Sequence, residues 1–373
     1  MKKTLFTTIT AALGLAAPLL FAQEIVVGEI VSLTGDKAGF GNELHNATQM
    51  AIDEVNAAGG VLGKKIKLVS EDTQSKPGEP AAAVRKLISR DKAVAVLGEY
   101  TSSLTLEAAP ICQGEKVPLI SPGATNPKVT QVGDYIFRVC FIDPFQGTVL
   151  SKFALETLNA KKAAVFTDIK QDYSIGLADF FKQHFTKNGG TIVVEKSYSS
   201  GDADFKAQLT AIKSANPDVI MIPGYYSQIG LIAKQARALG ITVPLIGGDA
   251  WSDSQLVAIG GTAVDGSYFT DHFSAENPDP KIQDFLKRYK TKFGKDAGSA
   301  AALGYDAALV LIDSIKRAGT TENAKLRDAI AATKGFAGIS GVITLDENRN
   351  ANKPAVILQV KGKDFKYVKT VNP

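Results

Sequence analysis

Two short segments rich in hydroxyl groups and glycine each follow a predicted buried strand. Gly98–Ser103 follows the apolar run Val94–Leu97, and Ser121–Pro127 follows Val117–Ile120. Ser102 occupies the predicted N-cap of a helix, where a hydroxyl and unpaired backbone N–H groups attract an anion. The second segment contains no cation and no metal ligand. Together the segments predict a site for a small anion such as a carboxylate, unless they only cap a helix and turn the chain.

The N-terminus has the pattern of a secretory signal peptide. Lys2 and Lys3 form a charged start, an apolar stretch covers 5–21, and the small residue Ala22 ends it. We therefore predict a signal peptide over 1–22, with a cleavage site that could shift by a residue or two, and an exported protein. The residue directly after the predicted cleavage site is not a cysteine, which argues against a lipid anchor.

Composition argues against several classes of protein. The 373 residues carry a formal net charge of +4, and removal of Lys2 and Lys3 leaves +2 because 1–22 contains no acid. So small a charge gives no support to a nucleic-acid-binding surface. Beyond the N-terminal stretch, no apolar run reaches the ~18 residues of a membrane span. Cys112 in a predicted helix and Cys140 in a predicted strand either form a disulfide or remain separate buried thiols, and the sequence leaves both readings open.

Strand-like and helical runs alternate along most of the chain, which predicts an α/β fold with parallel sheets covered on both faces. The rhythm changes after a strand expected at Gly266–Phe273, where three helices and hairpin-like strands follow. We therefore predict two doubly wound lobes, with the chain crossing between them more than once. The expected crossings lie near Phe141–Pro144, His272–Ser274 and Asn348–Asn352. The expected first lobe comprises 23–142 and 273–350, and the second comprises 143–272 and 351–373.

The predicted helices are the most sharply bounded elements, since several end in glycine. They cover Asn42–Ala58, Pro80–Arg90, Leu104–Gln113, Asp143–Leu158, Tyr173–Asn188, Asp204–Ala215, Ser227–Leu239, Pro280–Phe293, Ser299–Arg317 and Ala324–Thr333.

Motifs of catalysis and metal binding are missing from the sequence. No G-x-G-x-x-G follows the first strand, no P-loop follows any strand, and no G-x-S-x-G elbow occurs. His45, His184 and His272 are isolated, so their spacing does not predict a zinc site. We therefore predict a protein that is not an enzyme and that has no metal and no cofactor.

From about Glu24 to its end, the chain closely resembles the leucine/isoleucine/valine-binding proteins, type I periplasmic solute-binding proteins of amino-acid ABC transporters. The most specific matching motif is Ser-Pro-Gly-Ala-Thr-Asn-Pro at Ser121–Pro127. Further matching motifs are Gly59-Gly60-Val61, Phe145-Gln146-Gly147, Asp172-Tyr173-Ser174-Ile175-Gly176 and Gly224-Tyr225-Tyr226. The resemblance implies the type I periplasmic binding protein fold.

In that family the ligand lies between the lobes, and the resemblance implies roles for individual residues. Ser102 and Thr125 would bind the α-carboxylate of an amino acid. The carbonyl of Gly123, the hydroxyl of Thr125 and the carboxylate of Asp249 would bind the α-ammonium group. The other implied ligand-binding residues are Ala124, the aromatic wall residue Phe40, and Tyr173 and Tyr225, which would close from the second lobe.

Some positions depart from the family pattern. The family often has Glu where this chain has Asp249, so the shorter acid needs a small shift or a bridging water to reach the ammonium. Ser299–Leu303 lacks the bulky aromatics that some members place against the ligand side chain, and Trp251 is a candidate replacement. If the backbone is extended at Tyr225, only one of Tyr225 and Tyr226 faces the cleft.

The resemblance implies capture of a free L-amino acid, first of all a branched-chain aliphatic one. A monomeric protein would deliver this ligand to the membrane permease of an ABC transporter. The alternative is a periplasmic receptor that senses a related amino acid or a small amide with the same fold. The sequence leaves open which amino acid is preferred and which permease is the partner.

Overall fold

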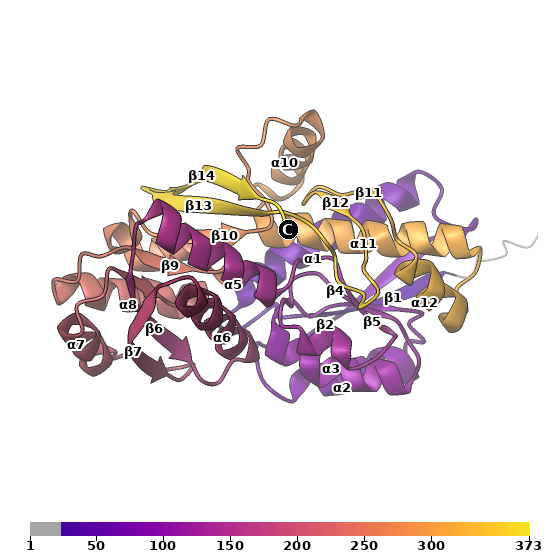
Figure 1. Cartoon of the computed structure of the whole chain (residues 1–373). Helices are drawn as coiled ribbons and strands as arrows, with labels where there is room; N and C mark the ends of the chain where they lie inside the picture. Colours follow the sequence, from indigo (N-terminus) through magenta and orange to yellow (C-terminus); the bar gives the residue numbers. More distant parts are fainter. Residues whose placement is uncertain (1–23) are drawn as a thin grey trace, which may run out of the picture.

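The computed structural model describes residues 24–373, which form two lobes that each contain one large sheet (Figure 1). The predicted signal peptide, residues 1–22, lies outside the described residues. The α/β class and the two doubly wound lobes are as predicted.

The first lobe has a five-stranded parallel sheet in the order β2-β1-β3-β4-β5. Its strands are β1 (Ile25–Val31), β2 (Ile66–Asp72), β3 (Val96–Gly98), β4 (Leu119–Ser121) and β5 (Ile136–Arg138). The helices connecting them are α1 (Ala38–Ala57), α2 (Glu79–Ser89), α3 (Ser102–Gly114) and α4 (Lys128–Gln131). Strands such as β1 are apolar almost throughout because helices cover both faces of a parallel sheet.

Three later helices return to the first lobe, namely α10 (Pro280–Phe293), α11 (Ser299–Ala318) and α12 (Asn323–Ala331). Helix α11 packs along α1, which buries Phe40, Leu44, Ala47 and Ala51. These residues recur at intervals of three to four, so they form one stripe of the helix.

The second lobe has a seven-stranded sheet in the order β14-β13-β10-β9-β8-β6-β7. Its strands are β6 (Lys162–Asp168), β7 (Thr191–Tyr198), β8 (Val219–Met221), β9 (Leu245–Gly247), β10 (Tyr268–Asp271), β13 (Ala355–Lys361) and β14 (Asp364–Val371). Strands β6 to β10 are parallel, and the β13–β14 hairpin adds an antiparallel edge. Two short strands, β11 (Phe336–Ala337) and β12 (Val342–Ile343), pair outside both sheets.

The helices of the second lobe are α5 (Asp143–Lys152), α6 (Asp172–Lys187), α7 (Lys206–Ser214), α8 (Tyr226–Ala238) and α9 (Ser254–Gly260). Helix α5 continues through a π-helical turn at Phe153–Thr157, and 3-10 turns cover Asp249–Trp251 and Gly261–Val264. The sequence did not predict α9, a short helix whose N-cap Asp253 accepts from the Gln255 N–H group at 2.7 Å.

The parallel strands of the two lobes share one order. Numbered along the chain within each lobe, five strands in each sheet follow the order 2-1-3-4-5. Ligands of such sheets bind outside the carboxyl ends of the strands, at the switch point where the strand order reverses. This point lies between β1 and β3 in one lobe and between β6 and β8 in the other.

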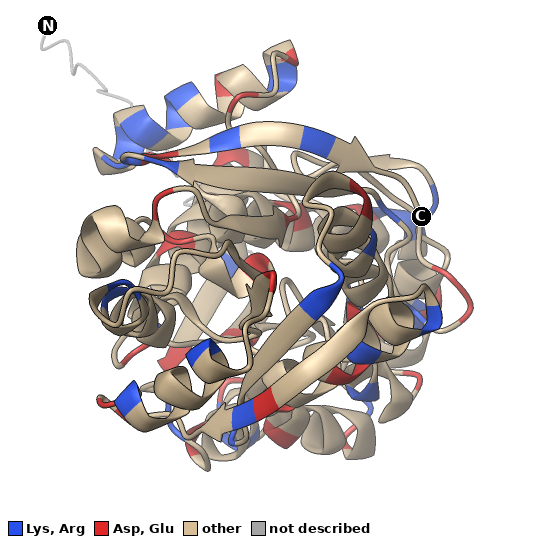
Figure 2. Ribbon diagram, turned by 60° about the vertical axis from the view of Figure 1, so that its left-hand side comes forward, with Lys and Arg blue, Asp and Glu red and all other residues tan. Residues whose placement is uncertain are grey.

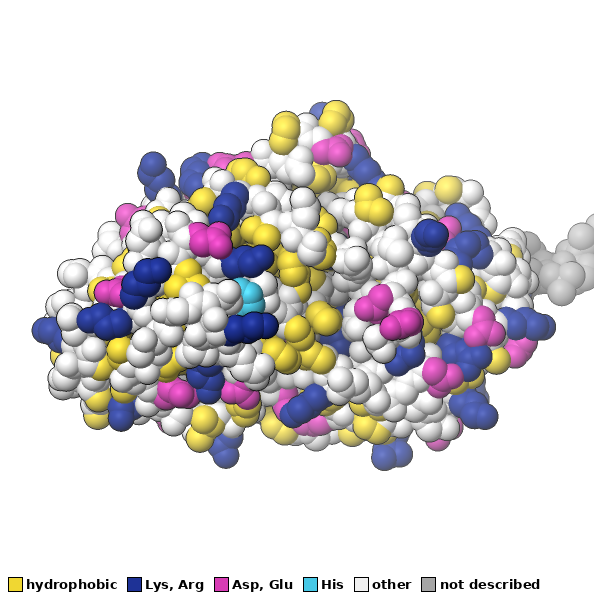
Figure 3. All heavy atoms as spheres, in the orientation of Figure 1, with side chains coloured by type: hydrophobic (Ala, Val, Ile, Leu, Met, Phe, Trp, Pro, Cys, Tyr) yellow, Lys and Arg dark blue, Asp and Glu magenta, His cyan; other side chains and the backbone are white. Residues whose placement is uncertain are grey.

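The chain passes between the two sheets three times: after β5, after β10 and before β13. The C-terminus lies where the lobes meet (Figure 1). On the face seen in Figure 3, hydrophobic side chains gather along this junction. A hollow of 180 Å³ lies there, lined in part by Phe141, Phe145, Asn350 and Pro373.

The two cysteines are buried and are not bonded to each other. Cys112 lies in α3 as predicted, but Cys140 is not in a strand, because β5 ends at Arg138. Burial raises the pKa of both thiols. Acidic and basic residues are interspersed over both lobes (Figure 2). Within residues 24–373, no helix is sufficiently long and apolar to cross a membrane.

Candidate functional site

The predicted site residues follow equivalent strands of the two lobes. Phe40 and Tyr173 come after the first strand of their lobe, Ser102 and Tyr225 after the third, and Gly123–Thr125 and Asp249 after the fourth. In each lobe these positions surround the switch point of the sheet. All of these residues are buried, and the side chains of Ser102 and Thr125 are each only 1% exposed.

The start of α3 is the most favourable place for an anion. Thr101, not Ser102, is the N-cap residue, with extended backbone angles (φ −89°, ψ 144°), so the predicted cap position was wrong by one residue. The Thr101 side chain bonds to Glu99 and no side chain caps the helix. The Ser102 hydroxyl instead accepts from the Asn126 N–H group at 3.2 Å, which ties the two predicted segments together. The N–H groups of the first turn therefore have no side-chain partner.

The loop after β4 presents unpaired polar groups at the same edge. In the described part of the chain, neither the N–H group nor the hydroxyl of Thr125 has a hydrogen-bond partner. The hydroxyl lies beside the Asp143 carboxyl without completing a hydrogen bond of standard geometry. Ala124 is different, because its N–H group donates to Ser121 Oγ at 3.0 Å and its carbonyl accepts from Arg138. Ala124 therefore anchors the loop, while Thr125 is free to bind.

A buried arginine lies behind this loop, which the sequence did not predict. Arg138 is fully buried and donates to the carbonyls of Ala124 and Asn126, the latter at 2.9 Å. Burial lowers the pKa of its guanidinium group. The loop itself contains no cation, as its sequence indicates, but β5 places one directly behind it. The only signal for Arg138 was a single basic residue in an otherwise apolar strand, which did not point to this loop.

Glycine at position 123 is required by a neighbouring ring. A Cβ atom on Gly123 would lie 2.5 Å from Tyr100 Cε2, because the Tyr100 ring covers this backbone. The same ring stacks on Phe40 with centroids 4.6 Å apart. The Tyr100 hydroxyl is buried without a hydrogen-bond partner. Tyr100 thus belongs to the interlobe region, although it was not among the predicted site residues.

Asp249 is a buried acid of the second lobe that lacks a full counter-charge. Its Oδ1 accepts from Gln146 Nε2 at 2.7 Å, and its Oδ2 lies 3.3 Å from His272 Nε2. Burial lowers the pKa of His272, despite the opposing effect of Asp249, so the imidazole is neutral at pH 7. An unpaired buried carboxylate is costly, and an ammonium group would neutralise it.

A second buried acid, Asp143, lies near Asp249. Asp143 is fully buried, and both of its carboxyl oxygens lack a hydrogen-bond partner. Burial and then the charge of Asp249 raise its pKa well above the usual range. The raised pKa favours the protonated, neutral form of Asp143, which lies next to Thr125, so Asp249 is the acid that could meet an ammonium group.

Both adjacent tyrosines contact the first lobe. Tyr225 is extended (φ −90°, ψ 148°), but α8 begins at Tyr226, so the alternation of a strand does not apply. Tyr226 accepts from the Gly39 N–H group at 3.1 Å, and its ring meets Phe40 edge-on at 4.9 Å. Lys37 Nζ lies 5.0 Å from the centre of the Tyr225 ring. The expectation that only one of the pair faces the cleft was made for an extended strand, and it does not apply because α8 begins at Tyr226.

Asp172, at the start of α6, joins the lobes directly. Its N–H group donates to Ser103 Oγ at 2.9 Å, and its carbonyl accepts from Asn126 Nδ2 at 2.7 Å. Its carboxylate also pairs with Lys128 Nζ at 3.2 Å. The lobes are therefore in contact beside the anion end, in a closed arrangement.

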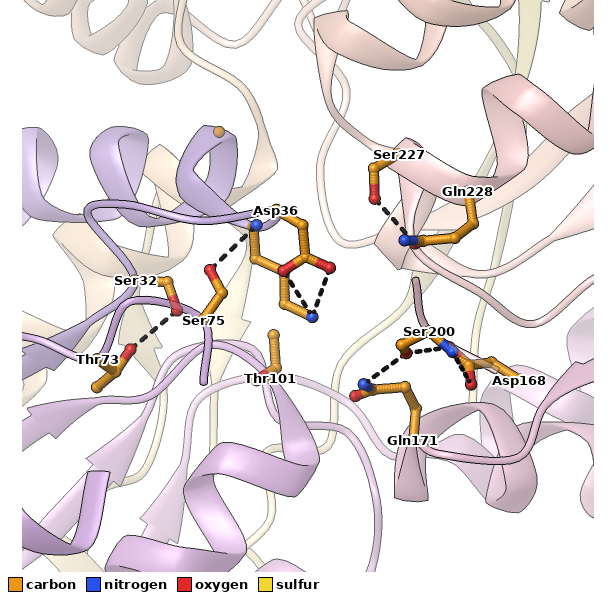
Figure 4. Close-up of polar contacts among 12 residues, drawn as sticks. Ser32, Asp36, Thr73, Ser75, Thr101, Asp168, Gln171, Ser200, Ser227 and Gln228 are labelled. Carbon is orange, nitrogen blue, oxygen red and sulfur yellow. Dashed lines mark hydrogen bonds and ion pairs between the residues drawn. The ribbon is translucent and has the colours of Figure 1, made fainter. Parts of the chain in front are cut away.

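Further polar side chains of the two lobes lie away from these contacts. Figure 4 shows Ser32, Thr73, Ser75 and Thr101 of one lobe on one side, and Asp168, Gln171, Ser200, Ser227 and Gln228 of the other lobe on the opposite side. The contacts drawn there stay within each lobe, such as the 3.0 Å bond from Gln171 Nε2 to Ser200 Oγ. Residues 24–373 contain no group of three or more His, Cys, Asp or Glu side chains that could hold a metal ion.

Comparison with known proteins places the chain in a family. Residues 24–365 match the family model described as periplasmic binding protein. The chain belongs to this periplasmic binding protein family. The leucine-binding protein LivK of Thermotoga maritima is 42% identical, with a TM-score of 0.90 over 94% of this chain and 99% of that one. The LivJ substrate-binding protein of Streptococcus pneumoniae, solved with isoleucine, is 34% identical, with a TM-score of 0.89 over 94% and 100%.

Two named relatives match the chain over a similar length. The Leu/Ile/Val-binding protein BraC3 of Rhizobium johnstonii is 35% identical over 325 residues, which is 87% of each chain. A protein of Pseudomonas aeruginosa described as binding leucine, isoleucine, valine, threonine and alanine is 31% identical over 90% of each chain. These periplasmic binding proteins match nearly the whole chain, so both lobes belong to the family fold.

Proposed function

We propose that this periplasmic binding protein captures a free L-α-amino acid between its lobes. The observation that carries the proposal is the opposition, across one buried interface, of neutral donors at Ser102 and Thr125 and an uncompensated acid at Asp249. An amino-acid head group has the complementary charges. Branched-chain aliphatic amino acids are the first choice, because the named relatives bind them.

In this proposal the carboxylate meets the first lobe, and the ammonium lies between first-lobe oxygens and the acid of the second lobe. The first turn of α3, Ser102 and Thr125 hold the carboxylate, and the positive end of the helix adds to their attraction. The Gly123 carbonyl, the Thr125 hydroxyl and Asp249 hold the ammonium. Phe40, Tyr173 and Tyr225 form the apolar walls, and Ala124 supports the loop.

We further propose that the protein works in the periplasm as a monomer without enzyme activity, and that it delivers its ligand to the permease of an ABC transporter. The relatives that are substrate-binding proteins of such transporters support this role. The lobes would correspond to 23–142 with 273–350 and to 143–272 with 351–373. The crossings near Phe141–Pro144, His272–Ser274 and Asn348–Asn352 would act as the hinge.

The test is calorimetric titration of protein that has been unfolded and refolded to remove carried ligand. We expect at least one L-amino acid to bind with a Kd of about 1 μM or tighter, roughly −8 kcal/mol. Its D-enantiomer is the matched control, because it cannot place carboxylate, ammonium and side chain together. If no amino acid in a full panel produced heat or a thermal shift, the proposed function would be wrong.

A further inference from the structure

A second interlobe space lies beside the proposed head-group site. This cavity of 600 Å³ is bounded by α1 and the start of α11 in the first lobe, and by β10 and the β13–β14 hairpin in the second. Its inner polar residues are Glu43, Ser252, Asp271 and Ser299. Side chains of both signs, among them Lys295 and Glu276, form its outer part.

Ser299 is buried in this cavity wall with an unused hydroxyl. It is the first residue of α11, its side chain is 1% exposed, and its Oγ has no hydrogen-bond partner. It lies close enough to the Asp271 carboxyl to lower the pKa of that group, although the contact lacks the geometry of a standard hydrogen bond. A buried unpaired hydroxyl costs about 1–3 kcal/mol, so native proteins seldom retain one without a use.

Two carboxyl groups share the cavity with this hydroxyl. Asp271 is 1% exposed and accepts from Ser252 Oγ at 2.5 Å and from the His272 N–H group at 2.7 Å. Glu43 accepts from the Gly298 N–H group at 3.1 Å. Each carboxyl retains further acceptor capacity, because an oxygen accepts more than one hydrogen bond. Burial raises the pKa of Glu43 to about 8 and that of Asp271 to about 7, so Asp271 is the carboxyl that more readily becomes a charged acceptor above neutral pH.

Residues that line this cavity are close neighbours, along the chain or through contacts, of residues in the wall of the proposed site. Glu43 lies one helical turn after Phe40 on α1, and Ser252 lies three residues after Asp249. Asp271 precedes His272, which contacts Asp249 at 3.3 Å. The Tyr100 ring stacks on Phe40, and burial followed by the charges of Asp249 and Asp271 raises the pKa of its hydroxyl. A ligand side chain that passes Phe40 would therefore approach these acceptors.

We propose that this cavity is a subsite for the far end of the ligand's side chain. It accepts amino acids whose side chain ends in a hydrogen-bond-donating nitrogen, either an amide or an ammonium group, in addition to aliphatic ones. Ser299 and Asp271 receive the nitrogen, while Ser102, Thr125 and Asp249 hold the head group. This subsite rests on the proposed function, because it takes the position of the head group from it.

The test compares four ligands on the stripped protein: leucine, norleucine, glutamine and lysine. Norleucine is the matched control for lysine, because it has the same carbon chain without the nitrogen. We expect lysine or glutamine to bind about tenfold or more tightly than norleucine, the factor expected for one well-made hydrogen bond. If Ser299→Leu, which fills the cavity, binds lysine and glutamine no more tightly than norleucine, the side-chain nitrogen lies in this cavity.

Two further variants distinguish the ligand classes. Asp271→Asn should weaken lysine about tenfold relative to leucine if the donor is an ammonium, and should spare glutamine if it is an amide. Ser299→Ala removes the hydroxyl without filling the cavity and should have a smaller effect than Ser299→Leu. Thermal unfolding confirms that each variant is folded.

The outcomes separate the two proposals. If leucine binds but neither lysine nor glutamine exceeds norleucine, the subsite is refuted and the proposed function stands. Preferred binding of lysine or glutamine that is insensitive to the changes at Ser299 and Asp271 also refutes this subsite. If no amino acid binds at all, the proposed function itself fails.

Discussion

The two lobes present the same positions of the same sheet order with opposite chemistry. In the first lobe, Ser102 and Thr125, whose donors are neutral, follow the third and fourth strands. In the second lobe, Tyr225 and Asp249, an aromatic residue and a buried acid, follow the corresponding strands. In the proposed site, the shared sheet order therefore sets the positions of the ligand-facing residues, and the residue types set which charge of the ligand each position can receive. Under this proposal neither lobe alone completes a site for a zwitterion.

The strongest test of this comparison removes the acid of the second lobe. Asp249→Asn keeps the shape but removes the buried charge, and we expect amino-acid binding to weaken by about 2–5 kcal/mol. That loss corresponds to a Kd about thirty-fold to several thousand-fold higher. Calorimetric titration measures it, and Asp179→Asn on the exposed face of α6 is the control. Equal affinities of the Asp249 variant and the unchanged protein would remove Asp249 from the site.

The equivalent change in the first lobe should cost less. Ser102→Ala removes one hydroxyl, but the N–H groups at the start of α3 remain, so we expect a loss of about 1.5–3 kcal/mol in binding. Ser103→Ala is the matched control, since its hydroxyl bonds to Asp172 rather than facing the head group. Calorimetry with both variants decides the point. A larger effect at Ser103 than at Ser102 would contradict the proposed carboxylate site.

Asp271 of the second lobe should make the free energy of unfolding depend on pH. Burial raises the pKa of Asp271 from 3.8 to about 7, and Ser252, Ser299, the His272 N–H group and Asp249 modify that shift. Between about pH 4 and pH 7, the folded state therefore holds a proton on Asp271 that the unfolded state has lost. The contribution of Asp271 to the free energy of unfolding accordingly falls as the pH rises through this range. The free energy of unfolding of Asp271→Asn minus that of the unchanged protein should be higher at pH 8.5 than at pH 5, by on the order of 1–2 kcal/mol.

Urea unfolding of the ligand-free protein at both pH values measures this difference. Asp364→Asn, on the exposed hairpin, is a suitable control. A pH-independent difference between Asp271→Asn and the unchanged protein would show that Asp271 is charged in the folded state throughout this range.

The smallest expected effect concerns the contact that joins the lobes outside the proposed site. Asp172→Ala removes the ion pair with Lys128 and the carboxylate contact with Ser103, but leaves its backbone bonds. Because exposed ion pairs contribute about 0–1 kcal/mol, we expect ligand affinity to fall no more than about fivefold. Ligand must still favour the closed arrangement by bridging the lobes.

Small-angle scattering with and without ligand measures the closure. The radius of gyration should fall on ligand binding in both proteins, and the ligand-free Asp172 variant should have the larger value. An unchanged radius in the presence of confirmed binding would favour a preclosed pocket over a hinge.

Much of the architecture could be predicted from local patterns. The predicted helix Pro280–Phe293 has the same bounds in the structure, because Asp279 and Pro280 start it and Gly294 ends it in a left-handed conformation (φ 69°). The alternation of apolar runs with helices predicted the parallel strands of the two sheets. The predicted N-cap of α3 was displaced by one residue, because Thr101 and Ser102 are both hydroxyl residues and only the backbone angles distinguish the cap from the first turn.

The sequence by itself determined which polar groups the loop Ser121–Pro127 and the segment at Ser102 present. These groups belong to contiguous residues that directly follow their strands. The tertiary structure alone decided the rest. Arg138 supports that loop from β5, Tyr226 reaches Gly39 across 187 positions of the chain, and Ser299 meets Asp271 from the opposite lobe. Such partners carry no local signal, since a buried charge or an unpaired hydroxyl acquires meaning only when packing excludes water and brings distant segments together.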